Sequence, residues 1–237
     1  MKVRASFFIH PRVLFYDMKK LGIVTIGQSP RPDVTKEVRR ILGGDVEFVE
    51  YGALDGLTLE VVRKVKPGPD VRPLVTSMRD GTEVKVTHEF VTPRVQKGIY
   101  ELEKRGVDLI LLLCTGKFPE LKSNKIVVMP SEMVTGVVNA SLRAGRLGIA
   151  LPGKEQVSTP SEKRGELEVF YDAASPYGPV EEIEKMARRF AEKKVDLVFL
   201  NCMGFDPGMK ELVKRITGKP VIQSSAVVAR VLQELIE

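Results

Sequence analysis

Two stretches of this chain, VDLILLLCTGKFP (Val107–Pro119) and VDLVFLNCMGFDP (Val195–Pro207), are near copies of each other, with seven of thirteen positions identical. Each contains one of the only two cysteines, Cys114 and Cys202. Each begins as an apolar run after a charged helical segment, which predicts a buried parallel strand with the cysteine just past its carboxyl end. Ligands bind at that edge of open α/β sheets. Two such edges that face each other, each with one thiol, predict a two-base active site.

The repeat continues beyond the cysteines. LGIVTIGQ (21–28) resembles LGIALPGK (147–154), and KIVVMPSEMVTGVV (125–138) resembles KPVIQSSAVVARVL (219–232). Helices between short apolar strands imply right-handed parallel βαβ units. The sequence therefore predicts an α/β fold of two pseudo-symmetric, flavodoxin-like halves. The expected elements are strands at 22–26, 46–50, 126–129, 147–151, 167–171 and 220–223, the two cysteine strands, and helices at 32–42, 58–65, 93–105, 131–143, 180–193, 208–217 and 225–236.

The spacing of the repeat also predicts domain boundaries. We expect a tail or a misassigned start at 1–20, with Met18 as an alternative first residue, then halves at 21–130 and 131–223. The opening strands are offset by 126 residues but the cysteines by only 88, so the first half carries an insertion, placed at about 66–92. PLVTSMRDGTEVKVT, within it, predicts a β-hairpin that turns at Asp80-Gly81. Such an arm serves as a lid, a dimer contact or a surface ornament.

Composition narrows the class of protein. The chain is 43% apolar and 29% charged, and no apolar run has membrane-spanning length, so we expect a soluble protein. Of its net charge of +6, +4 falls in residues 1–20, which leaves no basic stripe for nucleic acid. Two cysteines without a signal-peptide pattern indicate a cytoplasmic protein. Few Asn and Gln beside abundant Lys, Glu and Arg are typical of thermophile proteins.

The cysteines have competing interpretations. A single Cys after a buried strand is more often a small core residue than a catalyst, and a structural disulfide is a further alternative. Equivalence across a repeat favours a functional role for Cys114 and Cys202. Gly116 and Gly204 follow two residues later, and amide groups there are expected to bind a carboxylate and to lower the thiol pKa.

The loop after the opening strand is the next candidate. TIGQSPRPD (25–33) places Gly27, Gln28, Ser29 and Arg31 just before a helix, where exposed amides and a guanidinium suit an anion. The loop has neither the Walker nor the dinucleotide spacing. Its alternative role is simple capping by Ser29, with Pro32 in the first turn.

Ser131 and Ser225 open helices that point to the same edges, so both could touch a ligand, although helix capping is the favoured interpretation. Asp108 and Asp196 start their strands far from the ligand edge and are expected to be turn residues. Two scattered histidines and the absence of paired ligand motifs predict no metal site, and no cofactor is expected.

The chain resembles a known group of proteins. The two-cysteine pattern is similar to the aspartate/glutamate/hydantoin racemase superfamily, and TIGQSPR, NCMGF and PVIQSSAVVARVL resemble the AroM-like family from Leu21 onward. The resemblance implies cofactor-independent chemistry, in which one thiolate removes the proton next to a carboxylate and the opposite thiol returns one. Cys114 and Cys202 would take those roles. Thr115 matches a residue that holds the substrate carboxylate, and Gly27, Gln28 and Ser29 match the substrate loop. The resemblance also implies that the last helix, at 224–237, rejoins the first half.

The chain departs from the superfamily pattern after the second cysteine. Amino-acid racemases commonly have Cys-Thr-His there, whereas this chain has Met203, Gly204 and Phe205. The leading hypothesis is an isomerase or racemase-like enzyme for a small carboxylate metabolite, with a different or larger substrate than an amino acid. The alternatives are a non-catalytic metabolite-binding or regulatory protein and a redox pair. No nucleic-acid or membrane partner is expected, and a homodimer remains open.

Overall fold

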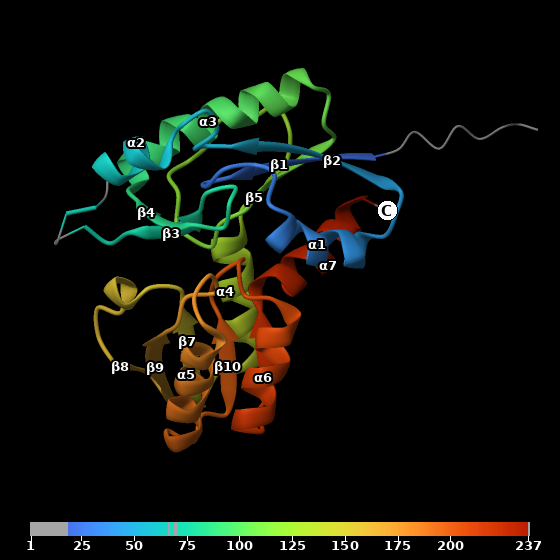
Figure 1. The fold of residues 1–237 in the computed structure, drawn as a ribbon. Helices are drawn as coiled ribbons and strands as arrows, with labels where there is room; N and C mark the ends of the chain where they lie inside the picture. Colours follow the sequence, from blue (N-terminus) through green and yellow to red (C-terminus); the bar gives the residue numbers. More distant parts are fainter. Residues whose placement is uncertain (1–18, 66, 69–70, 237) are drawn as a thin grey trace, which may run out of the picture.

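The computed structural model describes residues 19–65, 67–68 and 71–236, and it contains two open β-sheets, one in each half of the chain (Figure 1). The predicted tail lies outside the described residues, except for Lys19 and Lys20. The first sheet is wholly parallel, in the order β2-β1-β5-β6. Its elements are β1 (Lys19–Thr25), α1 (Pro32–Leu42), β2 (Val46–Gly52), α2 (Leu59–Lys64), α3 (His88–Lys104), β5 (Leu109–Leu112) and β6 (Val127–Val128).

The second sheet repeats this order as β9-β7-β10-β11, and one antiparallel edge strand, β8, pairs with β9. Its elements are α4 (Pro130–Ser141), β7 (Gly145–Leu151), the 3-10 turn η1 (Lys154–Gln156), β8 (Ser161–Arg164), β9 (Leu167–Ala173), α5 (Val180–Glu192), β10 (Leu197–Leu200), α6 (Pro207–Thr217), β11 (Val221–Gln223) and α7 (Ser224–Ile236).

The cysteine strands are anchored alike in the two sheets. The Asp108 carboxylate accepts the backbone N–H of Lys20, and the Asp196 carboxylate accepts that of Arg146. Both carboxylates lie at the amino ends of their strands, on the edge away from the cysteines, in agreement with their predicted local role.

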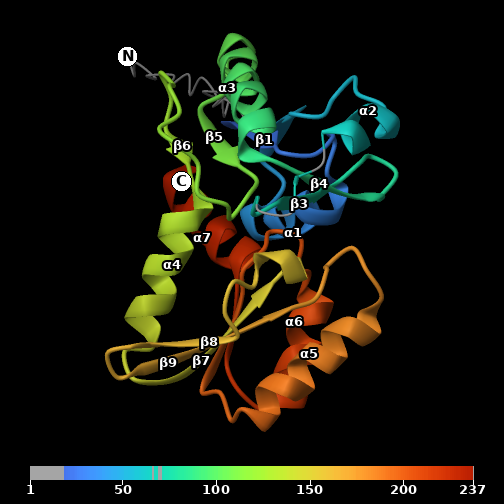
Figure 2. The same ribbon diagram turned by 90° about the vertical axis from the view of Figure 1, so that its left-hand side faces the viewer.

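The core is continuous between the halves. Helices α1, α7 and α4 lie between the two sheets, and α7 packs against both α1 and α4 (Figures 1 and 2). One cluster of buried side chains therefore includes Ile23 of β1, Val38 of α1, Leu232 of α7 and Ile149 of β7. The outer faces are covered by α3 on the first sheet and by α5 and α6 on the second. In the described residues, no helix combines the length and apolar character that a membrane span needs.

The predicted insertion forms an antiparallel hairpin from β3 (Leu74–Ser77) and β4 (Glu83–Val86). It lies on the side of the first half that faces the second (Figure 1). Side-chain contacts tie it across the gap, between Glu83 and Ser175 and between Lys85 and Glu155. The hairpin therefore becomes one wall of the space between the two sheets.

Two elements differ from the sequence prediction. Helix α3 begins at His88 rather than at residue 93, because Thr87 caps it by accepting the N–H of Phe90. Pro93, the first residue of the predicted helix, lies inside the observed one. Strand β8 was missed because SEKR has no apolar alternation, as suits a polar edge strand.

Candidate active site

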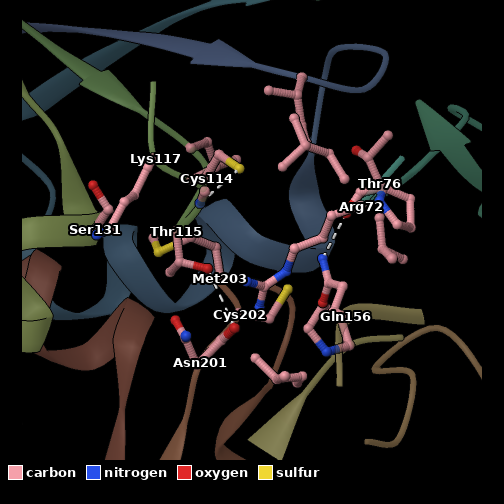
Figure 3. Close-up of a pocket in the computed structure, with 18 of the residues that line it drawn as sticks. Arg72, Thr76, Cys114, Thr115, Lys117, Ser131, Gln156, Asn201, Cys202 and Met203 are labelled. Carbon is pink, nitrogen blue, oxygen red and sulfur yellow. Dashed lines mark hydrogen bonds between the residues drawn. The ribbon is translucent and has the colours of Figure 1, made fainter. Parts of the chain in front are cut away.

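Both cysteines line one cavity between the carboxyl ends of the two sheets (Figure 3). Cys114 follows β5, and Cys202 follows β10. The cavity has a volume of about 370 Å³. The hairpin strand β3, the loop after β1 and the start of α4 supply further walls. One thiol from each half therefore reaches a single ligand-sized space.

A direct hydrogen bond joins the two cysteine loops. The Thr115 hydroxyl donates to the backbone carbonyl of Asn201 at 3.2 Å. Since each of these residues is the immediate neighbour of a cysteine, the bond fixes the separation of the two thiol-bearing loops. The Thr115 hydroxyl proton is therefore used in a bond within the protein, and this limits the predicted role of Thr115 as a donor to the substrate carboxylate.

Local amides contact both sulfurs. The N–H of Gly116 donates to Cys114 Sγ at 3.2 Å, and the N–H of Gly204 donates to Cys202 Sγ at 3.4 Å. These bonds favour the thiolate, as predicted. Burial has the larger effect and the opposite sign, and it raises the pKa of Cys114 to about 12 and that of Cys202 to about 11. The expected fall in thiol pKa is therefore wrong for the ligand-free cleft.

This gives a testable pH dependence. Because the pKa of each thiol is raised, the reactive thiolate is scarce near neutral pH and grows as the pH rises toward 11 and 12. Iodoacetamide at about pH 8 should react on the order of 100-fold more slowly with Cys202, and on the order of 1,000-fold more slowly with Cys114, than with an exposed cysteine. Peptide mapping should find Cys202 modified before Cys114. Rapid and equal alkylation of both thiols would contradict the burial argument.

Arg31 is a buried basic group in the cleft, and all its hydrogen-bond donors are used within the protein. Its side chain is 3% exposed. Nε and Nη2 form a fork to the Asp33 carboxylate at 2.9 and 2.7 Å, and Nη1 donates to Thr76 at 3.2 Å and to Thr25 at 3.5 Å. Nη2 also donates to the Tyr177 hydroxyl at 3.0 Å. All five N–H groups have acceptors, so Arg31 supplies charge and position rather than an open carboxylate clamp.

Tyr177 is a site residue that sequence reasoning missed. It lies in the loop after β9, at the carboxyl edge of the second sheet, and its hydroxyl reaches Arg31 of the first half. This hydroxyl also lowers the pKa of the Cys202 thiol and partly opposes burial. A Cβ at Gly204 would lie 2.6 Å from the Tyr177 oxygen, so this close approach needs glycine. The signal was its position after a parallel strand.

The loop after β1 meets the hairpin more than the ligand space. Among the described residues that line the cavity, the loop contributes Ile26 and Arg31, whereas Gly27, Gln28 and Ser29 do not line it. A Cβ at Gly27 would lie 2.4 Å from Thr76 Oγ1, so this glycine permits β3 to pack closely. Gln28 donates to the carbonyls of Leu54 and Leu57, and Ser29 bonds the Asp55 carboxylate. These three predicted binding residues are corrected to structural ones, because their polar groups are used within the fold.

The two predicted serines differ in whether they line the cavity. Ser131 lines the cavity from within the first turn of α4, whose N-cap residue is Met129, so the favoured capping interpretation is wrong there. Ser225 is buried in the first turn of α7, where it bonds Gln223 and does not line the cavity. Gly116 lines the cavity, whereas Gly204 lies behind it, against Tyr177.

Several further polar side chains line the cavity without having been singled out. Their shared feature is a position at a strand end or in a connecting loop, and they are Arg72, Thr76, Lys117, Gln156 and Asn201 (Figure 3). Asn201 had a usable signal, since it is a polar residue at the end of an apolar strand and precedes Cys202. In the part of the chain that the structure describes, no three His, Cys, Asp or Glu side chains gather as metal ligands would.

Comparisons with known proteins agree with this geometry. A family model described as AroM protein matches residues 21–236. A comparison with curated proteins finds no match. Among solved structures, the chain is similar to glutamate racemase from Francisella tularensis in complex with D-glutamate (14% identity, TM-score 0.58, covering 92% of this chain and 81% of that one). It is also similar to maleate cis-trans isomerase from Nocardia farcinica (14%, 0.59, 92% of each) and to an unliganded arylmalonate decarboxylase (14%, 0.55, 92% of each). These likenesses establish the aspartate/glutamate racemase-like fold.

Proposed function

The chain belongs to the AroM protein family, and from that premise we propose that it is a cofactor-independent isomerase or racemase-like enzyme that acts on a small carboxylate through Cys114 and Cys202. One observation carries the proposal: each half places a single thiol, held by the amide two residues later, in the same cavity. Solved structures with this fold include a racemase, an isomerase and a decarboxylase. This pairing is what proton transfer at a carbon next to a carboxylate needs, since acid and base must approach it from different sides.

The surroundings of the thiols suggest their roles. Cys202 receives a hydrogen bond from Gly204, Arg31 and Tyr177 also lower its pKa, and that pKa is the lower of the two. Cys202 is therefore assigned as the thiolate base. It takes the α-proton and becomes a thiol, and the electron pair passes into the substrate as an enolate. Cys114 then gives its proton to carbon from the other side and becomes the thiolate.

The enolate needs donors that the protein does not already use. Arg31 is saturated, so the donors assigned are the Asn201 amide and the Ser131 hydroxyl, which line the cavity (Figure 3). The start of α4 adds its helix dipole on the same side. Fixed donors aimed at developing charge are usually the largest contribution to such a reaction.

Tyr177→Phe tests the support of Cys202. The pKa of Tyr177 is raised by burial, so its hydroxyl remains a proton donor. Without it, the pKa of Cys202 should rise further, and alkylation of Cys202 at fixed pH should slow about tenfold. Cys114, whose hydrogen-bond partner is the amide of Gly116, is the internal control and should change little. An equal effect on both thiols would indicate a general loosening of the cleft.

The activity itself is tested by solvent deuterium exchange. Wild-type protein in D₂O with a panel of carboxylates that bear a stereogenic α-carbon should incorporate deuterium at that carbon, as followed by proton NMR. The absence of exchange for every member, including dicarboxylates, would contradict the proposal.

One observation favours the non-catalytic alternative. Burial keeps both thiols protonated near neutral pH, as suits a protein that only binds a metabolite. Alkylation in the presence of a bound carboxylate separates the two functions. In an enzyme, the bound ligand should generate a reactive thiolate. In a binding protein, the ligand should only protect the two thiols from alkylation.

A further inference from the structure

A second chamber adjoins the cysteine cavity. It also has a volume of about 370 Å³, and the two spaces share Arg72, Lys117, Thr135, Leu151, Gln156 and Asn201 in their walls. These shared residues form a neck between the chambers. A small carboxylate at the thiols would occupy only the first chamber, since cavities of about 300 Å³ already accept drug-sized ligands.

The chamber results from incomplete cover on the second sheet. Leu147, Ile149 and Phe199 form its floor, on the sheet face that helices α4 and α7 cover elsewhere. Its sides are α4, through Asn139, and the β8–β9 hairpin, through Tyr171. The space therefore has an apolar floor and polar walls, as ligand sites commonly do.

Gln156 in the neck has an unused acceptor. Its Nε2 donates to the backbone carbonyl of Pro73 at 2.9 Å, which fixes the orientation of the amide, because a flipped amide would place oxygen against oxygen. Its Oε1 is buried and has no hydrogen-bond partner among the described residues. A buried orphan acceptor costs free energy unless a donor fills the site. A ligand that displaces the side chains covering Oε1 would satisfy this acceptor with a hydroxyl or N–H group.

The charges around the neck are positive. Arg72 and Lys117 line both chambers. Arg164, further out, is already paired with Glu162 and Tyr171. Two cations at the neck, with the nearby acid engaged elsewhere, favour an anionic group on the ligand.

We propose that the second chamber receives the distal part of the substrate, which carries a hydroxyl or N–H donor for Gln156 Oε1 and a second anionic group toward Arg72 and Lys117. The inference rests on the proposed function for the position of the first carboxylate. It specifies the substrate as an extended, donor-bearing dianion, longer than the substrate of a single-chamber cleft. The apolar neighbours of Cys202 do not set this specificity, because the deciding groups lie beyond the thiols.

Binding of four probes tests the chamber without knowledge of the natural substrate. Calorimetry or ligand-observed NMR should find adipate about tenfold tighter than the shorter succinate and about tenfold tighter than hexanoate, which lacks the second carboxylate. Glucarate, which is adipate with hydroxyl groups along the chain, should bind about tenfold tighter than adipate. Equal binding of adipate and succinate, or no binding of any probe at millimolar concentration, overturns the proposal.

Variants assign the two preferences. Arg72→Ala combined with Lys117→Ala should remove the preference for adipate over hexanoate, whereas Lys154→Ala combined with Lys163→Ala, two exposed basic positions outside both chambers, should preserve it. Gln156→Lys can still donate to Pro73 but cannot accept. It should lose the preference for glucarate over adipate, as should Gln156→Leu. A preference that survives in Gln156→Lys, as it would if a water alone used the acceptor, overturns the assignment of the neck.

The result is separable from the proposed function. These binding ratios do not depend on proton transfer, so they should persist in a Cys114→Ser/Cys202→Ser double variant. If deuterium exchange fails for every carboxylate but the probe ratios are intact, the proposed enzyme activity is contradicted and the proposed role of the second chamber is supported. If exchange occurs on short substrates but the probes show no preference, the proposed role of the second chamber is contradicted and the proposed enzyme activity is supported.

Discussion

Replacing Cys202 with serine is expected to reduce solvent deuterium exchange at the substrate α-carbon by about 10³-fold, the middle of the usual range for a general acid or base. The serine hydroxyl is nearly isosteric with the thiol but does not ionise near neutral pH, so Gly204, Tyr177 and Arg31 would hold a group that cannot accept the proton. Cys114→Ser should slow exchange less, because Cys202 can still remove the α-proton and return a deuteron from the same side, but it should abolish inversion. NMR in D₂O measures both.

The controls separate chemistry from folding. Each serine variant should keep its melting temperature within a few degrees of wild type, since the amides of Gly116 and Gly204 can still donate to an oxygen. Ser141→Ala, at the exposed end of α4, is a matched change of hydroxyl content and should leave exchange unaltered. Exchange that persists in both cysteine variants would disprove the two-thiol mechanism.

Arg31→Leu is expected to lower the free energy of unfolding by about 3 kcal/mol, because it leaves buried hydroxyls such as those of Thr76 and Tyr177 without their charged donor. It also removes the positive charge that lowers the pKa of both thiols, so alkylation of Cys114 and Cys202 should slow together. Denaturant unfolding and peptide mapping measure the two effects.

Arg40→Leu is the matched control, since this arginine of α1 is 66% exposed and, among the residues that the structure describes, bonds only Glu37. A surface ion pair of this kind contributes less than about 1 kcal/mol. Arg31→Lys separates charge from geometry, because an ammonium group retains the charge but cannot reach Asp33, Thr76 and Tyr177 together. If Arg31→Leu unfolds like Arg40→Leu, the network around Arg31 does not stabilise the cleft.

The local patterns that the sequence carries predicted most elements of the fold. Apolar runs and Gly-marked ends located the strands that carry Cys114 and Cys202, and helix α1 occurs at the predicted 32–42. The errors occurred where the local signal was ambiguous. The predicted start of helix α3 at residue 93 is five residues later than the observed start, which Thr87 caps, and the charged strand β8 has no apolar alternation.

The sequence predicted the position of the candidate site more accurately than it predicted which residues line the site. Cys114, Thr115, Gly116, Arg31, Ser131 and Cys202 all line the cavity. Gln28 and Ser29 had the right residue types in the right loop, but their polar groups bond Leu54, Leu57 and Asp55. Whether a loop side chain faces a ligand or a neighbouring turn depends on partners that a local pattern does not contain.

The sequence by itself determined that two similar halves each bring one thiol to the carboxyl edge of a parallel sheet, because strand periodicity and the repeat are local properties of the chain. Only the tertiary structure decided what surrounds those thiols. Tyr177 meets Arg31 across 146 positions of sequence, and Gln156 meets Pro73 from the other half. Burial, which sets the thiol pKa values, is the sum of atoms from many elements, so it exists only once the chain has folded.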